Sequence, residues 1–185
     1  MIRVWLIRHG ASTAPPTSAI GATDPALSKE GRTQADQVAG LLQDRPLVRV
    51  VSSDRRRALA TARVVAAPHG LPVQPEAALR ELDFGSWEGR SLTDLWSEEA
   101  AAAKAWEADI RMTPPSFGES VHDLERRVRA FWDSLHPFAD DSGEVAIVAH
   151  AGSLAVLRSV ITRETVSESF ARRLELGGAV ALLAT

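Results

Sequence analysis

The sequence predicts an α/β fold, a three-layer α/β/α sandwich with a mostly parallel central sheet. Short apolar segments typical of strands alternate along the chain with segments whose apolar residues recur at helical spacing. Three of the four clearest strand segments are near-continuous apolar runs, which indicates burial on both faces and favours parallel pairing. The chain has 185 residues, a length that fits one domain.

The strand segments are bounded by polar or turn-forming residues. We expect four clear strands and a weaker one between the second and the third of them. In chain order, with the weaker segment third, they are Ile2–Ile7, Leu47–Ser52, Pro72–Gln74, Glu144–Ala149 and Ala179–Ala184.

The helices are predicted between these strands from caps and apolar stripes. Ser28 is placed to cap a first helix, and Asp54 a second helix that runs to about Ala67. A long apolar stripe follows at helical spacing over residues 121–135, and Gly152 opens a further helix. Residues 91–116 follow a loop and read as a helical insertion into the single domain.

Composition excludes several classes of protein. The net charge of −3 gives no general attraction for nucleic acid. With no cysteine, the chain has no disulfide and no thiolate metal site. No apolar run approaches the roughly 20 residues of a membrane span, and the N-terminal segment lacks a secretory apolar core. We therefore expect a cytoplasmic protein without nucleic-acid or membrane partners.

Charged and titratable residues gather where the strands end. Arg8 and His9 follow the first strand, residues 52–57 (SSDRRR) follow the second, and His150 follows the fourth. The last two of these stretches also enter helices, whose N-termini attract anions. Ligands of open α/β sheets bind at the carboxyl ends of strands. These positions together predict a pocket for a compact dianion, with phosphate as the obvious ligand.

Taken singly, each of these residues has a simpler interpretation. A lone histidine at a strand end is usually a packed or surface residue, and an arginine run is usually a solvated helix start. Their joint occurrence at the same relative place favours a site. No histidine or carboxylate motif has metal-ligand spacing, and no GxGxxG, P-loop or GxSxG motif occurs, so we expect no metal and no cofactor.

Cleavage of a phosphate ester also needs an acid for the leaving oxygen. The stretch at residues 79–91, LRELDFGSWEGRS, supplies three candidates. They are Glu81, Asp83 and Glu88, and the residue types do not decide among them.

Four spaced motifs occur in the order LIRHG, SSDRRRALATA, LRELDFGSWEG and VAHAGS along the chain. Two further stretches, DPALSKEGRTQA and FGES, accompany them. Together they resemble the histidine phosphatase superfamily, also called phosphoglycerate mutase-like, over nearly the whole chain.

The resemblance implies a role for each matching residue. His9 is the nucleophile that takes the phosphoryl group, and Arg8, Arg57 and His150 bind the phosphate. The proton donor of the family maps to Glu81. Glu88 maps to a structural position and ranks second as donor, and Asp83 ranks last.

The loop after His9 departs from the family pattern. Many members read RHGETxxN, whereas this chain reads RHGASTAPP. Ser12 can replace the threonine hydroxyl as an additional phosphate or substrate contact. Pro15 stands at the asparagine position and has no side-chain donor, so the contacts of this loop are in doubt.

The resemblance implies a metal-independent phosphomonoesterase that acts through phosphohistidine on a small phosphorylated metabolite, with α-ribazole 5'-phosphate as one candidate. Two alternatives stay open: a phosphoryl mutase of the phosphoglycerate type, and a non-catalytic binder of a phosphorylated ligand. The insertion at residues 91–116 is expected to cover the site, although its aromatic residues fit packing onto the domain better than substrate contact. The sequence does not determine the oligomeric state, and a homodimer is one of the alternatives.

Overall fold

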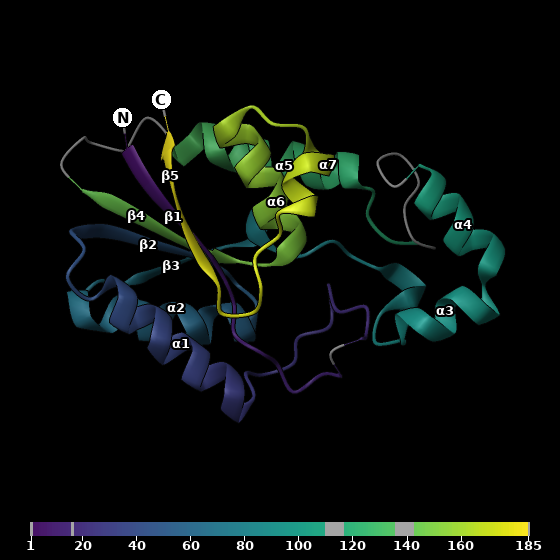
Figure 1. The fold of residues 1–185 in the computed structure, drawn as a ribbon, viewed down its shortest axis with the longest axis horizontal. Coiled ribbons are helices and arrows are strands. Elements are labelled where there is room, and N and C mark those ends of the chain that lie inside the picture. Colours follow the sequence, from purple (N-terminus) through teal and green to yellow (C-terminus); the bar gives the residue numbers. More distant parts are fainter. Residues whose placement is uncertain (1, 16, 110–116, 136–142, 185) are drawn as a thin grey trace.

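The computed structural model describes residues 2–15, 17–109, 117–135 and 143–184. Its centre is a five-stranded sheet in the order β3-β2-β4-β1-β5 (Figure 1). The strands are β1 (Ile2–Arg8), β2 (Leu47–Ser53), β3 (Val73–Glu76), β4 (Glu144–Ala149) and β5 (Ala179–Ala184).

The predicted mostly parallel sheet is confirmed. β4 pairs in parallel with β1 on one side and with β2 on the other, and β2 pairs in parallel with β3. Only β5 among these strands is antiparallel, along the outer edge of β1. The apolar runs gave the bounds of β4 and β5 correctly, while β1 and β2 each extend one residue further than predicted.

Helices cover both faces of the sheet, which gives the predicted three layers. Figure 1 shows α1 and α2 on one face and α5, α6 and α7 on the other. The α-helices are α1 (Lys29–Leu42), α2 (Arg56–Ala66), α3 (Leu92–Glu98), α4 (Ala100–Ala108), α5 (Val121–Leu135), α6 (Ala151–Thr162) and α7 (Val166–Ala171).

The hydrophobic core has one cluster on each face of the sheet. Val38, Leu42 and Val65 from α1 and α2 pack on one face. The apolar stripe of α5, with Leu124 and Val128, packs with α6 on the other face. β4 is buried along its whole length, as its continuous apolar run predicted.

Ser28 caps α1 as predicted, since its side chain accepts a hydrogen bond from the Gly31 N–H. The prediction that Asp54 caps the next helix is wrong. Asp54 instead forms an ion pair with Arg80. The Arg56 N–H at the start of α2 donates at 2.8 Å to Asp24, which comes from the loop before α1. A tertiary contact has thus replaced the local cap.

The helical insertion is present as α3 and α4, which extend away from the sheet (Figure 1). Trp106 of α4 packs edge-on against Trp87 and Phe84, with ring centroids 5.7 and 6.5 Å away. Residues 110–116 of the predicted insertion lie outside the described residues. In the part of the chain that is described, no helix is long and apolar enough to cross a membrane.

Candidate active site

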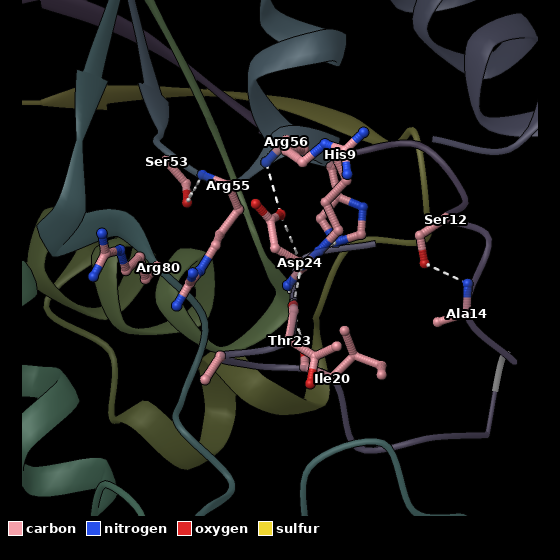
Figure 2. Close-up of polar contacts among 12 residues, drawn as sticks. His9, Ser12, Ala14, Ile20, Thr23, Asp24, Ser53, Arg55, Arg56 and Arg80 are labelled. Carbon is pink, nitrogen blue, oxygen red and sulfur yellow. Dashed lines mark hydrogen bonds and ion pairs between the residues drawn. The ribbon is translucent and has the colours of Figure 1, made fainter. Parts of the chain in front are cut away.

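Residues predicted to bind phosphate lie at the carboxyl ends of β1, β2 and β4. The His9 N–H donates to the Ala149 carbonyl at 3.0 Å, which joins the ends of β1 and β4. The rings of His9 and His150 lie with their centroids 4.9 Å apart and their planes inclined by 63°. The parallel register therefore brings together two histidines that are far apart in the sequence. In the view of Figure 2, His9 and Arg55 lie on opposite sides of Asp24, and a dashed line joins Asp24 to the Arg56 nitrogen.

His9 is buried and has a defined tautomer. Its Nδ1 lies 2.7 Å from the Gly10 carbonyl oxygen, and a carbonyl can only accept, so Nδ1 carries the proton. Nε2 is then the nitrogen with the lone pair. Burial, together with the positive charge of Arg57, lowers the pKa of His9 from 6.5 to about 3. The ring is therefore neutral at physiological pH, with its lone pair on Nε2.

Arg57 contacts that nitrogen directly. Its Nε–H donates to His9 Nε2 at 3.3 Å, and its Nη1 donates to the Thr23 carbonyl at 2.9 Å. Asp24 lies 3.9 Å from the same guanidinium, whose side chain is only 1% exposed. Burial lowers the pKa of Arg57, while the charges of Glu81 and Asp24 raise it. Arg57 is thus a fixed cation beside the lone pair of His9.

Glu88 organises the loop that holds Arg57. Its carboxylate accepts hydrogen bonds from the N–H groups of Gly21, Ala22, Thr23 and Phe84 and from the Thr23 hydroxyl. Burial raises the pKa of Glu88, but these hydrogen bonds outweigh it and lower the pKa overall. Since the carbonyls of this loop accept from Arg57, Glu88 acts on the site through that loop.

Arg8 and His150 each carry a buried nitrogen with no acceptor among the described residues. The Arg8 Nη1 donates to the Leu174 carbonyl at 2.8 Å, but its Nε has no partner there. His150 Nε2 lies 2.9 Å from the Ser53 hydroxyl, and its Nδ1 has no partner there either. Burial lowers the pKa of both side chains. Arg55 also has an unpartnered buried Nε. Buried polar atoms normally have partners, so these nitrogens fit a ligand rich in oxygen.

The Glu81 carboxylate lies at the first turn of α6. Both of its oxygens lie 3.0 Å from the Gly152 nitrogen, and one also accepts from the Leu82 N–H at 3.0 Å. A Cβ on Gly152 would lie 2.3 Å from Glu81 Oε1, so only glycine permits this approach. Burial lowers the pKa of Arg8 and Arg57, and the charge of Glu81 opposes that shift at both, so its carboxylate lies in the field of the two cations.

Two sequence candidates, Ser12 and Asp83, lie outside this network, as does Pro15. Ser12 accepts a hydrogen bond from the Ala14 N–H at 3.4 Å, on the far side of His9 from Arg55 in Figure 2, and its phosphate contact stays a prediction. The Pro15 carbonyl accepts from the Ser18 N–H. Asp83 accepts from the Gly85 N–H at 2.8 Å in an exposed turn. Among the three candidate carboxylates Glu81, Asp83 and Glu88, Glu81 is the one that contacts the start of α6.

The sequence reasoning missed three supporting residues. Ser53 contacts His150, and the Thr61 hydroxyl accepts from the Gly10 N–H at 3.2 Å. Arg127 of α5 donates to the Glu81 carbonyl at 3.0 Å. Ser53 and Thr61 belong to the second motif, so they could have been considered. Arg127 stands next to Val128, which belongs to the apolar stripe of α5. This neighbour is the one local indication in the sequence that Arg127 contacts the segment around Glu81. No three histidine, aspartate or glutamate side chains cluster for a metal ion within the described ranges.

The chain matches the histidine phosphatase superfamily (branch 1) over residues 4–183, and it belongs to that family. It is a phosphatase of this family, a phosphoric monoester hydrolase that acts on a phosphorylated small molecule.

Named relatives differ in the substrate that their names give. The chain is 35% identical over 157 residues to the adenosylcobalamin/α-ribazole phosphatase of Salmonella typhimurium strain LT2, covering 84% of this chain and 77% of the relative. It is 32% identical over 173 residues to the glucosyl-3-phosphoglycerate phosphatase of Mycobacterium tuberculosis, covering 89% and 77%. The crystal structure of the α-ribazole phosphatase from Shigella flexneri superposes with a TM-score of 0.87 at 32% identity, covering 97% and 89%.

Proposed function

We propose that the chain hydrolyses a phosphomonoester through a phosphohistidine on His9, without a metal. The supporting observation is the neutral, buried imidazole of His9, whose Nε2 lone pair faces Arg57 beside the unpartnered nitrogens of Arg8 and His150. A lone pair beside fixed cations suits attack on an anionic phosphorus centre, because the cations neutralise the phosphoryl oxygens.

In the first step, His9 Nε2 attacks phosphorus and the bond from phosphorus to the ester oxygen breaks. Glu81 gives its proton to that oxygen, which leaves as the neutral alcohol. The imidazole becomes cationic as the nitrogen–phosphorus bond forms. The Gly10 carbonyl, which accepts from Nδ1, stabilises that charge.

In the second step, water attacks the phosphohistidine. The Glu81 carboxylate takes a proton from the water, and the nitrogen–phosphorus bond returns its electron pair to Nε2. Arg8, Arg57 and His150 bind the phosphoryl oxygens in both steps. The role of each of these five residues is part of the proposal.

For the physiological substrate we propose α-ribazole 5'-phosphate, in line with the printed names of the Salmonella and Shigella relatives. A phosphorylated glycerate is the second candidate, because the mycobacterial relative is named for glucosyl-3-phosphoglycerate. The phosphorylated glycerate carries a carboxylate beside its phosphate, whereas α-ribazole 5'-phosphate has none there. We also propose that α3 and α4 of the insertion cover the site, because Trp106 packs on Trp87 and Phe84, and the Phe84 N–H donates to Glu88.

The test is phosphate release from p-nitrophenyl phosphate in EDTA, by the wild type and by His9→Ala. We expect hydrolysis that survives the chelator and falls at least about 10³-fold in the variant, the scale of loss when a nucleophile is removed. Acid-labile, base-stable incorporation of the phosphoryl group into the wild type alone would identify phosphohistidine. Activity that needs a divalent metal, or that persists in His9→Ala, would overturn the proposal.

A substrate panel then tests the finer proposal. A kcat/KM for α-ribazole 5'-phosphate well above that for glucosyl-3-phosphoglycerate supports the first candidate, and the reverse order supports the second. Interconversion of 3-phosphoglycerate without net phosphate release would favour the mutase alternative instead.

A further inference from the structure

We propose that Arg127, held by Glu119, is a positioning residue that fixes the main chain of Glu81 and so aims its carboxyl group at the leaving oxygen. This inference rests on the proposed role of Glu81 as the proton donor. Arg127 lies on α5, 46 residues further along the chain than Glu81.

The guanidinium of Arg127 uses all five of its N–H donors on one short segment and one carboxylate. Nη1 donates to the carbonyls of Ala78 and Arg80, at 2.6 and 2.8 Å, and Nη2 donates to that of Glu81 at 3.0 Å. The remaining two donors bind Glu119, from Nε at 2.7 Å and from Nη2 at 2.8 Å. An arginine side chain has five N–H donors, so every donor of Arg127 takes part in a hydrogen bond.

Glu119 holds the other end of the same segment. Its N–H donates to the Asp83 carbonyl at 2.8 Å, and its carboxylate lies 3.4 Å from the Asp83 nitrogen. The backbone is therefore held on both sides of Glu81, at residues 78–81 by Arg127 and at Asp83 by Glu119. A rigid backbone matters here because the Glu81 side chain reaches its place by a close approach to Gly152.

The pair of Arg127 with Glu119 fixes the orientation of the guanidinium. It is bidentate and half-buried, with side chains 24% and 18% exposed. Among the described residues, the 3₁₀ turn at Ala77–Leu79 and the stretch after it pair with no strand of the sheet. Arg127 supplies donors to three of the carbonyls there. Lysine cannot reproduce a planar fork with five donors.

The test compares two phosphate esters that differ in their need for a proton. The alcohol of 2,4-dinitrophenyl phosphate leaves as a stable anion, whereas that of glycerol 3-phosphate needs a proton from the enzyme. A misplaced acid therefore slows the second ester selectively. We expect Arg127→Lys to lower kcat/KM for glycerol 3-phosphate by about ten-fold or more, within the range of general acid catalysis, and that for the dinitrophenyl ester by less than about three-fold.

Two further variants complete the design. Glu81→Gln removes the proton itself and should show the same selectivity with a larger loss. Arg126→Lys is the matched control, because Arg126 is the neighbouring residue, is 75% exposed and pairs with Asp123. It should leave both rates unchanged. Melting temperatures establish that each variant is folded, and Glu119→Gln carries the test if Arg127→Lys does not fold.

The outcomes separate this inference from the proposed function. A selective loss in both Glu81→Gln and Arg127→Lys supports the inference. A selective loss in Glu81→Gln with an equal loss on both esters, or no loss, in Arg127→Lys overturns the inference and leaves the proposed function standing. Equal losses on both esters in Glu81→Gln overturn the acid role of Glu81 and the inference with it.

Discussion

Replacing Gly152 with alanine should lower the rate of hydrolysis strongly while it lowers the stability of the fold only a little. Gly152 lies in the first turn of α6, and its N–H is the donor that holds the Glu81 carboxylate. The added methyl group would lie 2.3 Å from Glu81 Oε1 and in ordinary contact, at 3.5 Å, with Leu124. The carboxylate must move, because the helix backbone cannot.

The size of the effect follows from that distance. A normal contact needs about 3.4 Å, so Oε1 must retreat by about 1 Å from its position 2.3 Å away, and such a misplacement can lower a rate by about 10²-fold. The lost hydrogen bonds to a charged group are worth about 1.5–3 kcal/mol. Alanine returns roughly 0.5–1 kcal/mol of helix stability over glycine. We therefore expect a large loss of rate with a net destabilisation of only about 1–2 kcal/mol, or a fall of about 2–8 °C in Tm for a chain of this length.

The assay is kcat/KM on glycerol 3-phosphate together with a thermal melt. Gly40→Ala is the matched control, because Gly40 lies within α1 and a Cβ there meets no atom within 4 Å. It should raise Tm by about 2–4 °C, with about 1 kcal/mol of stabilisation, and leave the rate unchanged. A Gly152→Ala enzyme that folds and keeps a rate within about three-fold of the wild type would refute the reasoning that the position of Glu81 at this helix start matters.

Three further predictions concern His9, Arg8 and Glu88. Burial and the charge of Arg57 lower the pKa of His9 from 6.5 to about 3 in the folded chain. Between these values only the unfolded chain binds that proton, so the free energy of unfolding should fall as the pH drops from 6.5 towards 3. Denaturant titrations around pH 5 give the slope of this free energy against pH, and in His9→Asn the slope should be smaller by about one proton. An unchanged slope would contradict the assignment. Inorganic phosphate at about 100 times its Kd should stabilise the chain by about 2.7 kcal/mol, a rise of roughly 5–11 °C in Tm, and Arg8→Gln should lose most of that rise; a full shift in the variant would exclude Arg8 as a phosphate ligand. Glu88→Gln withdraws the charge that orders the loop around Arg57, and we expect it to lower kcat/KM at least about ten-fold as well as Tm, whereas a change in Tm alone would show that the loop does not hold Arg57 in place.

Local patterns predicted the elements whose causes are local. Ser28 caps its helix through an N–H three residues away, so the sequence displays both partners together. The buried run of β4 has no polar residue after Glu144, which leaves a central strand as the natural interpretation. Asp54 failed as a cap because Arg80, 26 residues away, offers a bidentate partner that periodicity cannot reveal.

The site shows the same division. His9 and His150 could be placed together because parallel strands end at one edge, a rule that needs only the order of elements. The choice of Glu81 over Asp83 came from the family resemblance, and the contact of Glu81 with the start of α6 appears only in three dimensions. Arg127 was hidden in a helix whose apolar stripe explains its neighbours, because its partners are backbone carbonyls that carry no sequence signal.

The position of β1 has a consequence for synthesis on the ribosome. This first strand lies between β4 and β5, and its residue Arg3 contacts Glu144, 141 positions later. Its pairing with β5 reaches Ala184. The strand that carries His9 therefore stays unpaired until almost all of the described chain has been synthesised. Pairing across such long sequence separations slows folding, and the residues of the candidate site come together only when the last strands emerge.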